Sequence, residues 1–198
     1  MRAFVFASIL SLLPVAGAEA APQRVASLNL CTDELVLMLA DPRQIASVTH
    51  LSQSPAETPL WRLGRQHPRN DGSLLSVAAL RPDLVLTMGG GARDRMRIAE
   101  RLGIRTLDLP FPQTLRDIEH SIALVGVALG REAQSLALVR RIGALKRSRP
   151  TDAADTIWLG GGGRSVAADG LAAEWMALAG LRQRPLRGDR VSLEQLLG

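Results

Sequence analysis

Apolar residues in this chain form short runs that alternate with stretches of helical spacing, a pattern typical of α/β folds. The clearest example is residues 73–91, where Ser73 can cap a short helix that Pro82 ends. The apolar side chains of this helix are expected to face inward: Leu74, Leu75, Val77 and Leu80. The unbroken apolar run at 84–88 is typical of a strand covered on both faces of a parallel sheet. Glycines 89–91 end it at its carboxyl edge, where open α/β sheets bind ligands.

The rest of the first half repeats this pattern. Strands are expected at 24–28, 45–49 and 105–109, and helices at 32–40 and 92–102. Residues 50–71 are polar and interrupted by proline, which indicates a loop. The strand at 84–88 is therefore the third along the chain. Together these elements predict right-handed βαβ units and one parallel sheet.

Two longer helices follow. A capping-box pattern at 114–117 starts the first, Gly130 separates the two, and the second runs to about Ser148 before Pro150 ends it. The pattern then restarts with a strand at 156–159, glycines at 160–163 and a helix at 171–179. Residues 192–195 resemble another capping box, about two turns before Gly198. We expect a second, smaller lobe that is truncated.

The composition narrows the function classes. Residues 1–20 have the charged start, apolar core and Ala-Glu-Ala end of a cleaved signal peptide, so we expect an exported protein with no retained membrane anchor. The net charge is +5, but no basic helix is concentrated and tyrosine is absent, so no nucleic-acid partner is expected. The single cysteine excludes an internal disulfide, and the fold must rest on its core.

Seven segments, at 24–29, 40–45, 80–86, 102–104, 160–163, 177–181 and 191–197, carry a resemblance together with the long helical joint. In this order and spacing they resemble substrate-binding proteins of ATP-driven importers that serve iron-siderophore complexes and cobalamin. The resemblance implies two Rossmann-like lobes with parallel sheets, joined by a long helix, with a ligand cleft between them and an incomplete second lobe. The expected parts are a signal peptide at 1–20, a first α/β lobe at 21–113, a helical linker at 114–150 and the start of a second lobe at 151–198.

The same resemblance implies a function. A monomer in the periplasm would capture a metal chelate, without catalysis or a cofactor of its own, and deliver it to an inner-membrane ABC permease with its ATPase. In the family a glutamate on each lobe meets the permease. Glu194 occupies the second-lobe position, whereas Leu75 stands where the first-lobe glutamate is expected. A permease-independent cofactor chaperone or sensor therefore stays open as an alternative.

Candidate ligand-binding residues lie in loops that the resemblance places around the cleft. In the first lobe they are Asn29, Leu30, Cys31, Thr32, His50, Ser52, Trp61, Met88, Gly89, Gly90 and Arg93. In the second lobe they are Gly162 and Arg164. Arg93 and Arg164 could clamp acidic groups from both sides, because a guanidinium binds carboxylate or phosphate with two parallel hydrogen bonds. A purely structural interpretation stays open, in which Asn29 and Thr32 only cap a helix and the two arginines are solvated.

The tryptophans are the largest flat side chains of the sequence. Trp61, in the predicted loop, is the best candidate for stacking on a ligand, whereas Trp158 and Trp175 are expected in the core. Met88 stands where cobalamin-specific relatives are expected to carry an aromatic residue, and the absence of tyrosine argues against haem. The arginines at 182, 184, 187 and 190 are expected to form a solvated face.

Cys31 opens an alternative of another class, a thiol or metal-dependent hydrolase that uses His50 or His67. A helix N-terminus lowers the pKa of a thiol, which would favour a nucleophile, but a small buried side chain is the simpler interpretation. Two histidines without an associated carboxylate motif are a weak signal for a metal site, and no resident metal is expected. His120, in the middle of a helix, is expected at the surface.

Overall fold

The structure is a computed structural model that describes residues 20–89, 93–186 and 188–192, without the side chains of 93–95. Several predictions fall outside this range: the signal peptide except Ala20, Gly90, the side chain of Arg93, and Glu194 with its capping box. Among the described residues, no helix combines the length and apolar character needed to cross a membrane.

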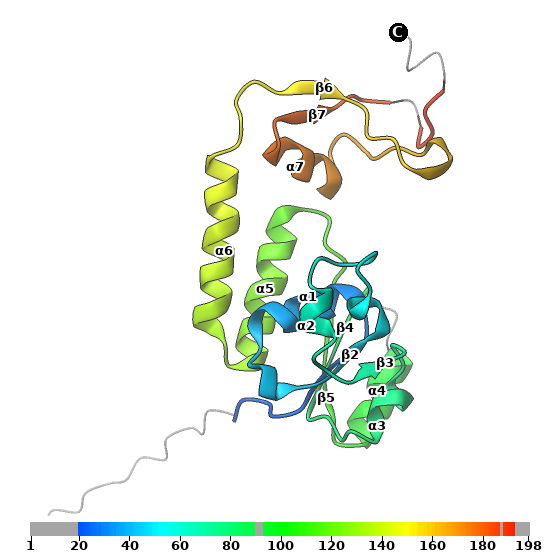
Figure 1. Ribbon diagram of the computed structural model, residues 1–198, viewed down its shortest axis with the longest axis vertical. Helices are drawn as coiled ribbons and strands as arrows, with labels where there is room; N and C mark the ends of the chain where they lie inside the picture. The colour runs from blue at the N-terminus through cyan, green and yellow to red at the C-terminus, as the bar shows by residue number, and fades with distance from the viewer. Residues whose placement is uncertain (1–19, 90–92, 187, 193–198) are drawn as a thin grey trace, which may run out of the picture.

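The first lobe is built on a parallel sheet of five strands in the order β3-β2-β1-β4-β5 (Figure 1). The strands are β1 (Val25–Ser27), β2 (Ile45–Thr49), β3 (Arg69–Asn70), β4 (Leu84–Met88) and β5 (Arg105–Leu109). Four of them lie where the apolar runs predict them. The run at 84–88 forms β4, which pairs with β1 on one side and β5 on the other. It is the fourth strand along the chain because β3 precedes it.

The prediction of a continuous loop at 50–71 is wrong. This segment contains the 3-10 helix η2 (His50–Gln53), the helix α2 (Trp61–Gly64) and the edge strand β3. These elements are too short to produce a hydrophobic period in the sequence, and β3 is held by its pairing with β2. Asn70 adds a side-chain bond from this edge, since its Nδ2 donates to the carbonyl of Ser27, 2.9 Å away.

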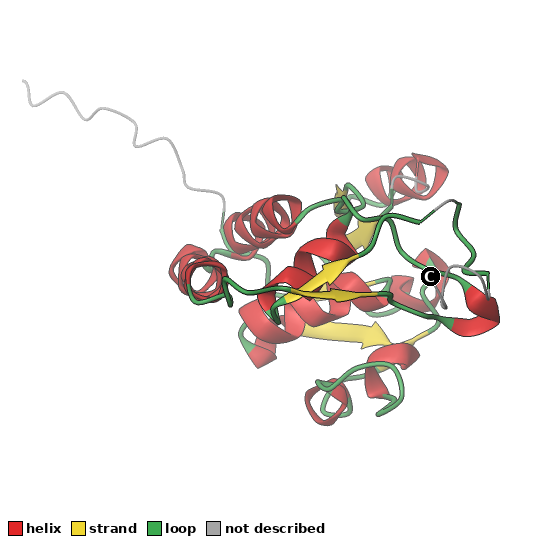
Figure 2. Cartoon of the chain, turned by 90° about the horizontal axis from the view of Figure 1, so that it is seen from above, coloured by secondary structure: helices red, strands yellow, loops and turns green. Residues whose placement is uncertain are grey.

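Helices cover both faces of this sheet (Figure 2). Alternate strand residues point to opposite faces, so Val25, Leu84 and Leu86 join one core and Ala26 and Val85 the other. On the first face pack α1 (Leu30–Leu39) and α5 (Leu115–Leu129). On the second pack α3 (Leu74–Ala78) and α4 (Arg93–Arg101).

Leu75 does not face inward as predicted, because its side chain is 86% exposed. The helix α3 is capped by Ser73 as expected but has only five residues. Its buried positions are Leu74 and Val77. Leu75 lies about 100° around the helix from Leu74, which turns it to solvent. The short helix can bury one stripe, and apolar character alone did not show which residue lies off it.

The predicted pair of long helices is confirmed as α5 and α6 (Glu132–Arg147), which lie side by side and antiparallel (Figure 1). Thr114 and Asp117 form the capping box, and Gly130 ends α5 in the left-handed conformation, with φ of 66°. Whereas α5 belongs to the core of the first lobe, α6 buries only Ser135 and leads to the second lobe.

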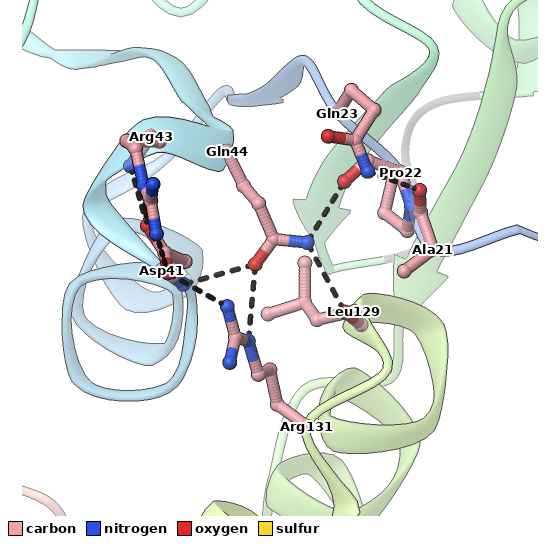
Figure 3. Close-up of polar contacts among 8 residues, drawn as sticks. All are labelled: Ala21, Pro22, Gln23, Asp41, Arg43, Gln44, Leu129 and Arg131. Carbon is pink, nitrogen blue, oxygen red and sulfur yellow. Dashed lines mark hydrogen bonds and ion pairs between the residues drawn. The ribbon is translucent and has the colours of Figure 1, made fainter.

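A buried glutamine ties the turn between these helices to the first lobe (Figure 3). Gln44 donates from Nε2 to the carbonyls of Pro22, at 2.8 Å, and Leu129, at 3.2 Å. Its Oε1 accepts from the backbone of Asp41 and from Nε of Arg131, which also pairs with the Asp41 carboxylate at 3.1 Å. The residues just after the predicted cleavage site are thereby fixed against the end of α5.

The closest approach of α5 to α6 is at Gly126, where an added Cβ would lie 2.3 Å from Oγ of Ser135. We expect Gly126→Ala to lower the free energy of unfolding by about 2 kcal/mol, because the helices must separate. Chemical denaturation followed by circular dichroism measures it. In the control Gly143→Ala the new Cβ meets only the end of the Arg147 side chain, at 3.3 Å. The higher helix propensity of alanine should make this control neutral or stabilising, and equal losses in both variants would contradict the argument.

The second lobe contains β6 (Ala154–Thr156), the 3-10 helix η3 (Gly161–Gly163), α7 (Leu171–Leu178) and β7 (Leu181–Gln183). The predicted strand at 156–159 is displaced, since β6 ends at Thr156 and pairs in parallel with β7, which the sequence pattern did not reveal. Trp158 and Trp175 are 50% and 46% exposed, so their assignment to the core is wrong. A sheet of two strands and one helix offers too little surface to bury them.

Candidate functional site

The candidate site of the first lobe lies at the carboxyl edge of its sheet. Because β1, β2 and β4 are adjacent and parallel, the loops that follow them meet at one edge. This topology brings together the predicted residues at 29–32, 50–52 and 88–89. Whether they contact a ligand stays a prediction.

The loop after β1 is tied to the loop after β4 by Asn29. Its Oδ1 accepts from the backbone of Thr32 at 2.9 Å, and its Nδ2 donates to the carbonyl of Met88 at 3.2 Å. Thr32 is fully buried, with its hydroxyl 2.7 Å from that of Ser27. Asn29 and Thr32 therefore have the capping and packing roles of the structural interpretation. Leu30 is half-buried, and Gly89 is exposed at the edge.

Beneath these loops lies a buried carboxylate that the sequence analysis missed. Asp33 is 0% exposed and accepts two hydrogen bonds from Thr49, from the backbone at 3.1 Å and from Oγ1 at 2.5 Å. Burial raises the pKa of Asp33, while hydrogen bonds from Ser27, Thr49 and Ser52 oppose that rise. Ser52 is itself buried and donates to the carbonyl of Thr49 at 2.9 Å. The network joins α1 to the ends of β1 and β2.

A signal for this network was present in the sequence. Asp33 stands three residues before the buried Val36, on the same face of α1, and the polar Ser27 and Thr49 end apolar strands. Polar residues at buried positions need hydrogen-bond partners. Several of them at the predicted buried positions of neighbouring elements therefore indicate a buried polar network. Position alone did not show that the three side chains meet.

The structure contradicts both interpretations of Cys31, as an activated nucleophile and as a small buried side chain. Its side chain is exposed, not buried, and its pKa is raised, not lowered. The causes are partial desolvation of the thiol and the nearby carboxylates of Glu34 and Asp33, which together exceed the opposing effect of a backbone hydrogen bond. No histidine is among these causes. His50 is exposed at the start of η2, and partial burial lowers the pKa of His67. In the described part of the chain, no group of three or more His, Cys, Asp or Glu side chains could hold a metal.

The raised pKa of the Cys31 thiol predicts a low rate of alkylation. We expect Cys31 to react with iodoacetamide more slowly than a free cysteine thiol at pH 7.5, because the reactive thiolate is scarce. The rate should rise with pH through a midpoint above the ordinary value of 9.0. Mass spectrometry of quenched samples measures the rate, with a cysteine-containing peptide as control. A midpoint below that of the peptide would show an activated thiol and revive the hydrolase alternative.

Trp61 is half-buried and already engaged by neighbouring cations. The guanidinium carbons of Arg62 and Arg65 lie 4.4 and 4.6 Å from its ring centroid. Arg65 is further held by the carbonyl of Gln53, to which its Nε donates at 3.0 Å. Stacking on a ligand, as predicted for Trp61, would require the ligand to share or displace these contacts.

In the second lobe, Gly162 is exposed with φ of 69°, as expected of a glycine turn. Arg164 is exposed and pairs with the Asp189 carboxylate at 2.7 Å. A clamp formed by Arg93 and Arg164 would have to break this pair, and the side chain of Arg93 lies outside the described residues. A cavity of about 590 Å³ lies within the second lobe, lined by residues of α7, β7 and the segment after α6, Arg149 and Glu174 among them.

Residues 25–148 match the family described as periplasmic binding protein. The structure is similar to a possible iron-binding, periplasmic solute-binding protein from Staphylococcus epidermidis, with TM-score 0.69, 14% identity and coverage of 90% of this chain and 74% of the other. It is also similar to the periplasmic vitamin B12-binding protein BtuF of Vibrio cholerae, with TM-score 0.61, 18% identity and coverage of 89% of this chain and 73% of the other. A periplasmic haem-binding protein from Pseudomonas aeruginosa is similar with TM-score 0.63, 23% identity and coverage of 88% of this chain and 68% of the other.

These structural similarities establish the fold: two α/β lobes with parallel strands, connected through long helices. The chain spans less than two thirds of other similar structures, 60% and 63% of two periplasmic binding proteins from Veillonella parvula. No curated protein matches the chain in sequence.

Proposed function

Because the chain belongs to the periplasmic binding protein family, we propose that it captures a metal chelate, an iron-siderophore complex or cobalamin, for import through an ABC permease. The observation that carries the proposal is the family match over 25–148, which includes the whole five-stranded sheet and its carboxyl edge. The ligand would lie between this edge and the second lobe. We place the protein in the periplasm after removal of residues 1–20.

The arrangement of the edge supports binding more than catalysis. Its buried polar groups are engaged in holding the loops in place: Asp33 by Thr49, and Asn29 by Thr32 and Met88. A preformed rim of this kind lowers the cost of ordering loops when a ligand binds. The raised pKa of Cys31 gives the hydrolase alternative no support. Residues available to touch a ligand are those exposed above the network, such as His50 and Gly89.

The permease contact is proposed at Glu194, with Leu75 at the corresponding place on the first lobe. Leu75 lies on the surface of α3, where a partner could reach it. An apolar side chain there would not pair with an arginine of a permease, so contact through Glu194 alone would be weaker than through two glutamates. Because Leu75 stands in place of a glutamate, a permease-independent cofactor chaperone or sensor remains the alternative function.

Titration of the leader-free protein with ferric siderophores, cobalamin and haem, followed by tryptophan fluorescence, tests the proposal. Haem is included because similar structures include haem-binding proteins of Pseudomonas aeruginosa and BhuT. We expect saturable binding of one class. His50→Ala should weaken it about tenfold if His50 touches the ligand, which corresponds to 1.4 kcal/mol. His120→Ala, at an exposed position on α5, is the matched control. Absence of saturable binding for every class would overturn the proposal.

A further inference from the structure

A second cavity, of about 430 Å³, lies where the helical joint meets the second lobe. Its walls come from three elements: the start of α5, the end of α6 with the residues after it, and α7. Four cationic side chains line it: Arg116, Lys146, Arg147 and Arg149. It lies on the helical joint and does not include the loops at the carboxyl edge of the first sheet.

The charges of this cavity are not balanced. Lys146 pairs with Glu119, with 2.6 Å between Nζ and Oε1. Among the described residues, Arg116, Arg147 and Arg149 have no ion-pair partner. The carboxylate in the cavity wall is Glu174, and its Oε2 accepts from the backbone of Leu115 at 2.5 Å. Three exposed arginines thus line one cavity together with a single carboxylate, which is itself engaged by a backbone amide.

Helix stabilisation explains only part of this cluster. Lys146 and Arg147 stand in the last turn of α6, where cations interact favourably with the helix dipole. Arg116 stands in the first turn of α5, where a cation is unfavourable. Its position costs helix stability, and an anion in the adjacent cavity would offset that cost. The planar guanidinium fork favours carboxylate or phosphate groups as that anion.

We propose that this cavity is a binding site for a compact polyanion that carries two or more carboxylate or phosphate groups. Arg116 binds it from the first-lobe side, and Arg149 binds it from the chain that leads into the second lobe. The bound anion bridges the lobes beside the contact between Glu174 and Leu115. The polyanion is either a free metabolite or an acidic arm of a metal chelate.

Isothermal titration of the leader-free protein with citrate and with inorganic pyrophosphate tests this site. We expect saturable binding that weakens at least tenfold in Arg116→Gln/Arg149→Gln and changes less than twofold in the matched control Arg140→Gln/Arg141→Gln. The control arginines are exposed on α6, whose end contributes to the cavity wall, but they do not line the cavity. Ala177→Phe, which fills the cavity without changing charge, should also weaken binding. Thermal unfolding of each variant verifies that it is folded.

A further arm distinguishes the two sources. Equal affinity for citrate and ferric citrate assigns the site to a free polyanion, whereas tighter binding of ferric citrate that the first double variant loses assigns it to the chelate. Equal weakening by both double variants, or binding that does not saturate, would show an adventitious ion only and overturn the proposal. Saturable binding of the chelates to the unaltered protein tests the proposal of the previous section, whereas loss of citrate and pyrophosphate binding in Arg116→Gln/Arg149→Gln tests this one, so failure of one proposal is separable from failure of the other.

Discussion

Leu86→Ala is expected to lower the free energy of unfolding by about 3 kcal/mol. Leu86 is 0% exposed in β4, the strand that connects the two halves of the first sheet between β1 and β5. Its removal takes away the transfer free energy of three carbon atoms and leaves a cavity in the core beneath α1 and α5. Urea denaturation followed by far-ultraviolet circular dichroism measures the loss.

The matched control is Leu75→Ala, which makes the same chemical change at a side chain that is 86% exposed. We expect less than about 0.5 kcal/mol there, because little apolar surface returns to water. Comparable losses at the two positions would contradict the orientation of α3. The control variant should also be tested for permease binding, since Leu75 stands at the proposed docking position.

Asp33→Ala is expected to cost about 3 kcal/mol, the second large effect. The substitution leaves the backbone amide and hydroxyl of Thr49 buried without the acceptor that now engages both. It also disconnects α1 from the end of β2. Denaturation under the same conditions measures the cost. The control is Asp152→Ala at an exposed position, where we expect no measurable change. A similar effect in both would mean that Asp33 is not held as the structure shows.

The pH dependence gives a second test of Asp33. Because burial raises its pKa in the folded state, the folded protein binds this proton more readily than the unfolded chain does. Its contribution is therefore greatest below the unfolded value of 3.8 and is lost as the pH rises through the folded pKa. Asp33→Asn cannot titrate, so the stability of the wild type relative to this variant should increase as the pH falls toward 3.8. A relative stability that decreases would contradict the raised pKa.

Other carboxylates act in the opposite direction, which is why the comparison uses a difference. Hydrogen bonds from Arg43 lower the pKa of Asp41 to about 2, and those from Ser73 lower that of Asp71 to about 2. Their stabilising contributions are present above 3.8 and are lost as the pH falls through about 2. Both groups are unchanged in Asp33→Asn, so their effects cancel.

Most of the first lobe could be predicted from the sequence, because strands and helices with buried faces have their own hydrophobic periods. The β1, β2, β4 and β5 strands, the capping box at Thr114 and the glycine end of α5 follow from local patterns. The short elements at 50–71 and the strand β7 did not, since pairing with a neighbour holds them. The order of the strands in the sheet could not be predicted from local sequence patterns either, because the packing of helices on both faces sets it.

The candidate site divides in the same way. The sequence by itself determined that loops after parallel strands, at Asn29, His50 and Gly89, share one edge, because strand direction follows from the alternation of strands and helices. Only the tertiary structure decided what each side chain does there. Asp33, Thr49 and Ser52 meet because three elements converge, and Arg164 is occupied by Asp189. Partners and burial depend on contacts between residues far apart in the chain, and no local pattern encodes those contacts.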